Sequence, residues 1–554
     1  MLHDSTLPNT PLTLASIVAT VGPTSSDAAT IGRLIQAGVS VFRLNFSHGE
    51  FATHAAVLTT IRQKARELGL PIGVLGDLPG PKIRLGDLPE AMELLAGQSV
   101  ILDAGATAAG GVQREPDGTL ILPCGYQRIG QDVQPGHRVL INDGAVRLLA
   151  VEHVVREGRQ ALRCCVTASG GGVISSRKGI NLPDSDLSVE PMQERDWQAV
   201  AFAVEHGLDF LALSFVRTAE EVIKLREYLA KVCVPGGGGG VDDDRAAFPI
   251  PVIAKIEKPQ AVKNLEAITK AADGIMVARG DLGVEMDIAD VPIVQRKIIA
   301  MADEWGKPCI VATQMLESMI TASLPTRAEA TDVAGAVLAG ADAVMLSAET
   351  AVGKHPVLVV ETMRRIIARA EESMAEMRTA PNPPRGVLST GYRTAALAHG
   401  AWYVARDVGA KLVVCWSQAG GLARYLSQTG FGLPIIAYSS SRPHLRGMAI
   451  LKGVRPLHCE VPDASGSAGG TESVSGIDAV GSVGCFGRTG GTGGIHGLGV
   501  EAWLSKVDRD IVGRSWAKIG ETIVVMYGSP LGLAKTGTVL AIRTIGSTEA
   551  KRSE

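Results

Sequence analysis

Lys255 and Glu257 stand one residue apart at the end of an apolar segment, Val252–Ile256. Side chains two residues apart on a strand point to the same face, so an ammonium and a carboxylate are predicted to lie side by side. A second carboxylate, Asp281, follows a later apolar segment within the glycine-containing turn 279–283. Two carboxylates beside a lysine can hold Mg²⁺ and leave positions open for phosphate oxygens. The alternative is that Lys255 and Glu257 form only a structural ion pair.

These groups favour phosphoryl transfer as the chemistry. That reaction needs neutralisation of the charge on the moving group more than covalent help, and Lys255 with Mg²⁺ supplies positive charge. The glycines of the turn 279–283 expose backbone N–H groups, which suit an anionic part of a substrate.

A second set of polar residues predicts a further cation site. Arg43 and Asn45 alternate along one apolar segment, and Asp77 ends the next. Their oxygens could gather around a cation beside a phosphate-binding arginine. Ser47 with Glu50 three residues later also has the pattern of a capping box that opens the following helix.

The elements that must position these residues repeat along the chain. Eight short apolar segments, each followed by a helical pattern, predict a (β/α)₈ barrel with a parallel sheet. They are Ile17–Val21, Val41–Asn45, Ile72–Leu75, Phe210–Phe215, Val252–Ile256, Gly274–Ala278, Cys309–Thr313 and Ala343–Leu346. Active sites of such barrels lie at the carboxyl ends of the strands. Polar residues that could take part in binding or catalysis follow seven of the eight segments, which is too regular for chance.

The predicted fold class is α/β, with a barrel, an inserted small all-β domain and a C-terminal open α/β domain. Alternating segments flank Asn142-Asp143-Gly144, a strong hairpin signal, in the block that interrupts the barrel. Successive prolines near residue 383 end the barrel's last helix. The predicted limits are 14–86 and 179–378 for the barrel, 87–178 for the inserted domain and 385–554 for the C-terminal domain. The glycine-rich segments 236–245 and 463–499 are predicted to be flexible surface loops.

Composition narrows the class of protein. The 554 residues include 54 Lys and Arg against 57 Asp and Glu, and aromatic residues make up 4%. Neither a basic surface for nucleic acid nor stacking platforms for bases are expected. The 8 cysteines form no CxxC pair, which favours a reducing compartment. Without a basic-apolar leader or a run of about 18 apolar residues, we expect a cytoplasmic protein with no membrane partner.

Motifs in this order, over nearly the whole chain, resemble the pyruvate kinase family. They are Ile17–Pro23, Arg43–Gly49, Gly76–Arg84, Arg177–Pro183, Ile253–Glu257, Ala278–Gly283, Ala312–Met319 and Met345–Thr350. The resemblance implies transfer of the phosphoryl group of phosphoenolpyruvate to ADP, giving pyruvate and ATP, on the same three-domain architecture.

The resemblance also assigns roles to residues. Glu257 and Asp281 would bind Mg²⁺ or Mn²⁺, and Lys255 would stabilise the phosphoryl group in transfer. Thr313 and the backbone of Gly280 and Asp281 would hold the substrate carboxylate, with Thr313 near the site of enolate protonation. The other implied contacts are Arg43 and Ser214 with the substrate, and Arg43, Asn45, His48, Arg84 and Lys178 with the nucleotide. Closure of the inserted domain would exclude water, and the family suggests a homotetramer.

One departure from the family concerns potassium. Relatives that need K⁺ commonly have Thr and Glu where this chain has Leu78 and Lys82. A fixed ammonium can replace a monovalent cation near phosphates, so we expect activity largely independent of K⁺. Asn45, Ser47 and Asp77, with Leu78, nevertheless keep the family's pattern of K⁺ ligands.

A second departure concerns regulation. The family's hydroxyl-rich effector loop is reduced here to Ser417-Gln418-Ala419-Gly420-Gly421-Leu422, so we expect weakened or altered activation by sugar phosphates. Two other functions stay open at this point: a lyase or aldolase on a similar magnesium-holding barrel, and a catalytically silent relative. His48 by itself is interpreted as a loop histidine rather than a base.

Overall fold

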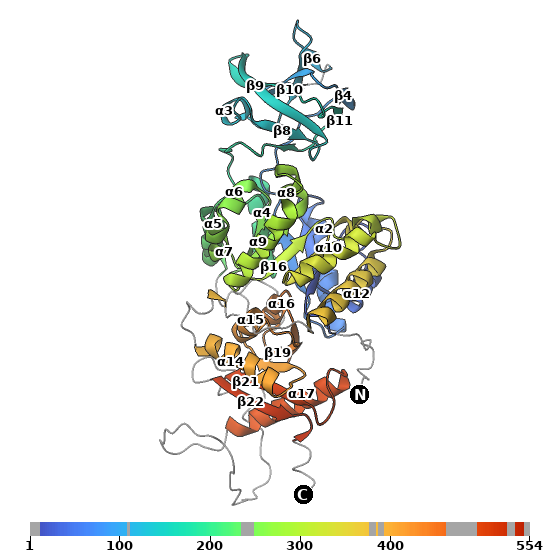
Figure 1. Cartoon of the computed structure of the whole chain (residues 1–554), viewed down its shortest axis with the longest axis vertical. Helices are drawn as coiled ribbons and strands as arrows, with labels where there is room; N and C mark the ends of the chain where they lie inside the picture. Colours follow the sequence, from blue (N-terminus) through green and yellow to red (C-terminus); the bar gives the residue numbers. More distant parts are fainter. Residues whose placement is uncertain are drawn as a thin grey trace, which may run out of the picture. The chain divides into compact units, whose positions relative to one another are not determined.

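A computed structural model of the chain describes residues 12–107, 111–233, 249–375, 384–385, 393–460, 496–528 and 538–547 (Figure 1). The chain divides into two compact units. The first comprises Thr13–Thr390 with Ala449–Lys452, and the second comprises Gly391–Met448 with Gly453–Glu554. The predicted loop 236–245 and most of the predicted loop 463–499 lie outside the described residues.

The first unit contains a closed parallel barrel, which confirms the predicted fold class. Its strands in chain order are β1 (Ser16–Thr20), β2 (Val39–Asn45), β3 (Gly73–Asp77), β13 (Phe210–Leu213), β14 (Val252–Ile256), β15 (Gly274–Ala278), β16 (Cys309–Ala312) and β17 (Ala343–Leu346). Each pairs with the next, and β17 closes on β1 with Ser16 opposite Ala343. All eight match the predicted apolar segments. Buried on both faces, such strands read as continuous apolar runs rather than alternating ones.

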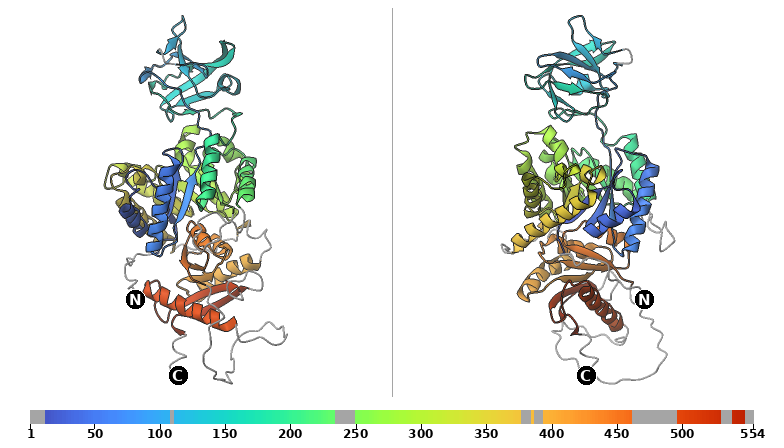
Figure 2. Two further views of the ribbon diagram at one scale, coloured as in Figure 1. Left: turned by 180° about the vertical axis from the view of Figure 1, so that it is seen from behind. Right: turned by 90° about the vertical axis from the view of Figure 1, so that its right-hand side faces the viewer.

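Helices cover the outside of the barrel (Figure 2). They are α1 (Ala28–Ala37), α2 (Phe51–Glu67), α4 (Glu194–Glu205), α5 (Ala219–Val232), α6 (Pro259–Lys263), α7 (Leu265–Ala271), α8 (Arg279–Glu285), α9 (Val291–Glu304), α10 (Arg327–Leu338), α11 (Ala348–Ala351) and α12 (Pro356–Ala375), with a 3₁₀ turn at Glu317–Ile320. Capping starts several of them: Thr326 and Glu329 form a capping box on α10. Ile31 and Leu34 of α1 are buried against the strands, as an amphipathic helix requires.

The predicted capping box of Ser47 and Glu50 is wrong. Helix α2 begins at Phe51, Glu50 occupies the N-cap position, and no side chain caps the helix. The backbone N–H of Ser47 instead donates to Asn45 Oδ1 at 3.2 Å. Gly49 follows with φ of 75°, a left-handed conformation that cannot belong to a helical turn. Residues 47–50 therefore form a turn that precedes α2, although the sequence pattern assigned them to the start of the helix.

The block between β3 and β13 folds as a small β structure. It contains β4 (Met92–Leu94), β5 (Ser99–Asp103), β6 (Gln113–Arg114), β7 (Leu120–Pro123), α3 (Ile129–Asp132), β8 (Arg138–Ile141), β9 (Val146–Arg156), β10 (Arg159–Val166), β11 (Gly172–Ile174) and β12 (Ile180–Asn181). The hairpin prediction is confirmed: β8 and β9 are antiparallel, and Asn142, Asp143 and Gly144 all have positive φ. The domain limits at 86–87 and 178–179 stay predictions.

The second unit contains a five-stranded sheet in the order β20-β19-β18-β21-β22. Its strands are β18 (Val413–Trp416), β19 (Ile435–Ser439), β20 (Val454–His458), β21 (Thr522–Gly528) and β22 (Thr538–Thr544), and its helices are α14 (Arg393–Asp407), α15 (Gly421–Gln428), α16 (Arg442–Met448) and α17 (His496–Gly513). The antiparallel β22 was not predicted. Helix α17 begins at His496, so the loop predicted to extend to residue 499 ends earlier, because helix formation starts before the apolar pattern does.

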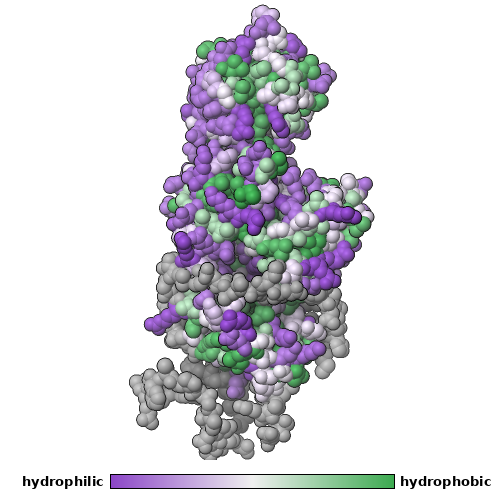
Figure 3. Space-filling model, viewed as in Figure 1, coloured by the Kyte–Doolittle hydropathy of each residue, from purple (hydrophilic) through white to green (hydrophobic). Residues whose placement is uncertain are grey.

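Hydrophilic and hydrophobic residues are interspersed on the face drawn in Figure 3. Within the described ranges, no helix combines the length and apolar character needed to cross a bilayer.

Candidate active site

Lys255 lies at the centre of a buried polar cluster at the carboxyl ends of β3, β13 and β14. Its Nζ lies 2.9 Å from Glu257 Oε1, 3.2 Å from Asp77 Oδ1 and 2.7 Å from Ser214 Oγ. The Lys255–Glu257 pair confirms the prediction from period-two spacing. The contacts with Asp77 and Ser214 arise because parallel strands end at the same edge of the barrel.

The charges of this cluster hold Lys255 protonated. Burial by itself would lower the pKa of Lys255, but the negative charges of Asp77 and Glu257 outweigh it and raise the pKa above its ordinary value. Burial would likewise raise the pKa of Asp77, and the charges of Lys255 and Arg43 lower it instead. Asp77 is therefore a carboxylate and Lys255 an ammonium at neutral pH.

Arg43 is held on the other side of Asp77. Its Nε donates to Asp77 Oδ2 at 2.6 Å, and its Nη1 donates to Thr20 Oγ1 at 3.1 Å. Thr20 was not predicted as part of the site, although it is a polar residue at the end of β1, the position that signals function in a barrel. In the described part of the chain, Nη2 of Arg43 has no hydrogen bond to protein, so it can meet a ligand.

Glu257 and Asp281 together fit a divalent cation. Glu257 is fully buried, and the backbone N–H of Phe215 donates to its Oε2 at 2.6 Å. Burial raises the pKa of Glu257, Lys255 opposes this, and the like charge of Asp281 raises it further. Repulsion between two carboxylates is relieved when both bind one cation. Among the described residues, no group of three or more histidine, cysteine, aspartate or glutamate side chains is placed to hold a metal ion.

Thr313 is held in an unusual backbone conformation. Thr313 and Gln314 have φ of 69° and 54°, in a region that non-glycine residues rarely occupy. Arg279 holds them there, because its Nη2 donates to the carbonyls of Thr313 at 2.6 Å and Gln314 at 3.0 Å. Such strain persists where the surroundings enforce it, commonly at functional sites. Arg279 was missed by sequence reasoning, although its place beside Gly280 in a strand-to-helix turn was a usable signal.

The Thr313 hydroxyl is already hydrogen-bonded. Its Oγ1 accepts from the backbone N–H of Gly280 at 2.8 Å and donates to the carbonyl of Ala312 at 2.6 Å. The N–H of Gly280, which the family resemblance assigned to a substrate carboxylate, is thus directed to Thr313 in this structure. The neighbouring Asp281 is in the first turn of α8 and keeps its side chain partly exposed.

Of the expected nucleotide residues, Arg43 joins the cluster through Asp77, whereas Arg84 and Lys178 lie elsewhere. Arg84 donates to the carbonyl of Arg177 at 3.1 Å, and Lys178 accepts a backbone hydrogen bond from Leu85. Both therefore lie on the two segments that connect the barrel and the inserted domain. His48 is exposed, and no side-chain hydrogen bond of His48 occurs within the residues that the structure describes.

The expected K⁺ ligands are engaged by protein groups. Asp77 meets Arg43 and Lys255, and the carbonyl of Leu78 accepts from Ser214 Oγ at 2.7 Å. The Lys82 ammonium lies 3.9 Å from Asp281 Oδ1.

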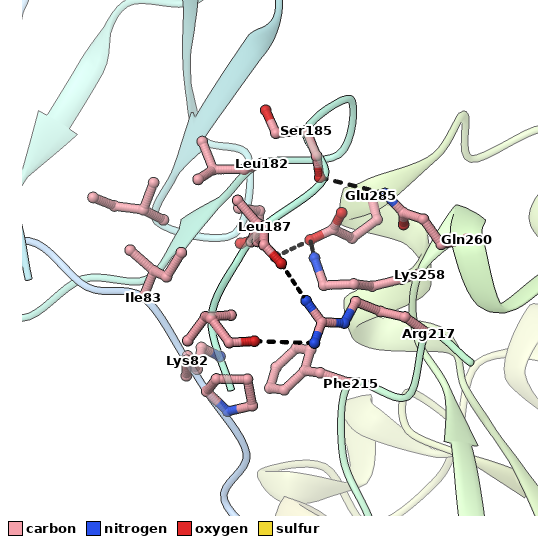
Figure 4. A pocket seen from close by; sticks show the side chains of 14 residues that line it. Lys82, Ile83, Leu182, Ser185, Leu187, Phe215, Arg217, Lys258, Gln260 and Glu285 are labelled. Carbon is pink, nitrogen blue, oxygen red and sulfur yellow. Dashed lines mark hydrogen bonds and ion pairs between the residues drawn. The ribbon is translucent and has the colours of Figure 1, made fainter. Parts of the chain in front are cut away.

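A small pocket lies where the connecting strands meet the barrel (Figure 4). Lys258 and Glu285 form an ion pair in it, and Arg217 donates from its wall to backbone carbonyls. None of these residues was predicted. Their local patterns resemble ordinary helix ends. The pairing of β14 with β15 brings Lys258 and Glu285 together, and the chain that returns from the inserted domain meets Arg217.

Comparisons with known proteins identify the family of both parts of the chain. The family model described as "Pyruvate kinase, barrel domain" matches residues 12–360, and the model described as "Pyruvate kinase, alpha/beta domain" matches residues 395–542. A curated protein named "Pyruvate kinase" from Mycobacterium intracellulare is 36% identical over 538 residues, 96% of this chain and 98% of that protein. Another of that name from Mycobacterium tuberculosis is 41% identical over 432 residues, 76% of this chain and 83% of that protein. The crystal structure of a pyruvate kinase from Cryptosporidium parvum has a TM-score of 0.76 at 30% identity and covers 96% of both chains.

Proposed function

The chain belongs to the pyruvate kinase family, whose members transfer the phosphoryl group of phosphoenolpyruvate to ADP, and we propose that the Lys255 cluster carries out this reaction. The observation that supports this assignment is the set of three short contacts made by the Lys255 ammonium with Glu257, Asp77 and Ser214. A permanently charged ammonium, fixed in a buried site, is suited to stabilise charge that develops on a phosphoryl group.

Glu257 and Asp281 are the proposed ligands of Mg²⁺ or Mn²⁺. A bound divalent ion supplies Lewis-acid charge neutralisation to phosphoryl oxygens. Glu257 is aimed by the Phe215 N–H, while Asp281 is carried by the short helix α8. Two carboxylates from different elements leave the remaining coordination positions to phosphate oxygens and water.

Lys255 acts by charge rather than by proton transfer in this proposal. Since its pKa is raised above the ordinary value by Asp77 and Glu257, although burial opposes this, it does not lose its proton at neutral pH. Ser214, which accepts from Lys255 and donates to Leu78, orients the ammonium and borders the substrate. Arg43 is proposed to bind a phosphate oxygen through Nη2, with its other nitrogens anchored by Asp77 and Thr20.

Thr313 is proposed to complete the second half of the reaction. After the phosphoryl group leaves, the enolate carbon needs one proton to become the methyl group of pyruvate. The Thr313 hydroxyl is held by Gly280 and Ala312, and would orient the water that delivers this proton. The substrate carboxylate is proposed to meet the backbone of Gly280 and Asp281, where it would displace the Thr313 hydroxyl from the Gly280 N–H and leave that hydroxyl held by the Ala312 carbonyl.

Nucleotide binding is proposed to involve Asn45, His48, Arg84 and Lys178. The last two are carried by the strands that connect the inserted domain to the barrel. Movement of that domain would bring their charges to ADP and exclude water from the transfer.

Two regulatory properties are also proposed. Activity is largely independent of K⁺, because the fixed ammonium of Lys82, 3.9 Å from Asp281 Oδ1, replaces a monovalent cation near the phosphates. Activation by sugar phosphates is weakened, because Ser417 Oγ accepts from the N–H of Ala423 and the Gln418 amide donates to Ser440 Oγ. A homotetramer in the cytoplasm, with domain limits at 86–87, 178–179 and 378–385, completes the proposal.

A coupled assay of pyruvate formation from phosphoenolpyruvate and ADP tests the function. Turnover that requires both substrates and a divalent ion supports it. Pyruvate release without ADP would indicate hydrolysis of phosphoenolpyruvate instead of transfer, and an absence of turnover would leave a lyase acting on another substrate or a silent relative.

A further inference from the structure

Three buried polar side chains from three separate elements meet at the base of the inserted domain. Asn181 is on β12, where the chain leaves that domain, Lys258 precedes α6, and Glu285 ends α8. Asn181 Nδ2 lies 2.9 Å and Lys258 Nζ lies 3.0 Å from the same atom, Glu285 Oε1. Their exposed fractions are 6%, 8% and 1%. Figure 4 shows the Lys258–Glu285 pair between the barrel and the connecting strands.

Stability alone does not account for this cluster. Burying an ammonium and a carboxylate costs solvation that their attraction often only offsets, and apolar residues of similar size are frequently as stable. In the described part of the chain, the second oxygen of Glu285, Oε2, has no hydrogen-bond partner. The cluster therefore leaves a polar atom unsatisfied, which a purely stabilising contact would avoid.

The cluster includes one residue from each of the two elements that carry the proposed metal ligands. Lys258 directly follows Glu257, and Glu285 lies four residues after Asp281 on α8, so the two acids share one helix face. Lys258 Nζ also lies 5.9 Å from the ring centroid of Phe215, whose N–H holds Glu257. A shift of the Glu285 carboxylate would thus be felt at both metal-binding elements.

The same cluster reaches the inserted domain through its exit segment, residues 182–189. Asn181 precedes this segment, and Arg217 donates to the carbonyls of Leu187 at 2.6 Å and Val189 at 3.0 Å. Gln260, just after Lys258, donates to the carbonyl of Ser185 at 3.4 Å. The exit segment is therefore fastened to the barrel top, next to the metal-binding elements.

We propose that Glu285 is a positioning residue, which joins the exit strand of the inserted domain, through Asn181, to the two elements that carry the metal ligands. Metal binding and the position of the inserted domain are thereby coupled. This inference rests on the proposed function, since it takes Glu257 and Asp281 as the ligands.

Two variants separate the two arms of the coupling. Glu285→Gln removes the charge that pairs with Lys258, and is expected to weaken Mn²⁺ binding about tenfold or more, as loss of outer-shell partners does. Asn181→Ala cuts only the link to the inserted domain. It should keep Mn²⁺ affinity within about twofold and raise KM for ADP about tenfold, the usual range for a lost charge-assisted hydrogen bond.

The matched control is Asp184→Asn. Asp184 lies in the same exit segment, but its bidentate ion pair is with Arg138 of the inserted domain, at 2.7 and 2.9 Å. This variant removes a charge of the same exit segment and keeps the hydrogen bonds of Asn181 and Lys258 with Glu285, so both Mn²⁺ affinity and KM for ADP are expected to stay close to wild-type values.

The experiment measures Mn²⁺ binding by electron paramagnetic resonance without substrates, and Mn²⁺-dependent protection of residues 175–190 from hydrogen exchange. We expect Mn²⁺ to protect this region in the wild type and in Asp184→Asn, but not in Asn181→Ala. If Asn181→Ala keeps the protection and an unchanged KM for ADP, the coupling is refuted. Should Glu285→Gln fail to fold, the Asn181→Ala result decides alone. A wild type that binds no Mn²⁺ or makes no pyruvate would instead refute the proposed function.

Discussion

Two buried lysines, Lys255 and Lys258, each pair with a glutamate, and the two pairs differ in their surroundings. The Lys255 ammonium contacts two carboxylates, those of Glu257 and Asp77, and the hydroxyl of Ser214. In the cluster of Asn181, Lys258 and Glu285 the arrangement is reversed, because one carboxylate oxygen of Glu285 accepts from both the Lys258 ammonium and the Asn181 amide. The first cluster has acidic groups in excess around its lysine, and repulsion from Asp281 prepares it for a cation. The second is neutral and acts through position.

The comparison teaches that a buried lysine–glutamate pair does not by itself identify an active site. A structural ion pair was the alternative considered for Lys255 and Glu257, and that interpretation describes Lys258 and Glu285 better. What separates the two is the number of further acids within reach and the location at the strand ends.

The largest expected effect is on Lys255. Lys255→Met is expected to reduce kcat by about 10³-fold or more, because the developing charge on the phosphoryl group loses its fixed ammonium. Lys258→Met should reduce kcat by no more than about tenfold, since that lysine acts only through position. Steady-state kinetics of the two variants measure the difference directly. Equal losses in both would break the comparison.

The second prediction concerns the stability of the cluster of Asn181, Lys258 and Glu285. Lys258→Met leaves the Glu285 carboxylate buried without its ammonium, and should lower the free energy of unfolding by about 3 kcal/mol. The double variant Lys258→Met/Glu285→Leu should recover most of this loss, because it removes the unpaired buried charge and replaces the ion pair with apolar packing. Urea unfolding of both variants provides the test, and a double variant no more stable than the single one would contradict it.

The third prediction follows from the raised pKa of Glu257. Burial and the like charge of Asp281 raise this pKa, against the opposing charge of Lys255, so protons compete with a divalent ion for the carboxylate. Mn²⁺ affinity should therefore fall as the pH falls, by up to about tenfold per pH unit below the raised pKa. Titrations of the wild type and of Asp184→Asn should show the same profile. An affinity that does not change with pH would show that Glu257 is not a ligand.

The smallest expected effect is that of potassium. Replacing K⁺ by a bulky organic cation at equal ionic strength should change kcat by less than about twofold, because the Lys82 ammonium, 3.9 Å from Asp281 Oδ1, supplies a fixed positive charge in place of K⁺. The double variant Leu78→Thr/Lys82→Glu provides the more decisive test. It introduces the residues of K⁺-dependent relatives and should create a K⁺ requirement. A large drop in wild-type activity without K⁺ would reject this prediction.

Much of the fold follows from local patterns. The apolar segments that end at Asn45, Leu75 and Ile256 predict strands at those places, and the structure has β2, β3 and β14 there, with β3 continuing to Asp77. The hairpin at Asn142 and Asp143 follows from the left-handed conformations that few residues accept. The capping box at Ser47 failed, because the side chain of Asn45 competes for the same N–H group.

The sequence by itself determined the pairing of Lys255 with Glu257, because strand geometry places alternate residues on one face whatever surrounds them. Only the tertiary structure decided that Asp77 meets Lys255, 178 positions further along the chain, and that Asn181 meets Glu285. These contacts depend on how the barrel closes and where the inserted domain re-enters it. Packing sets such distances, and no short-range periodicity along the chain encodes them.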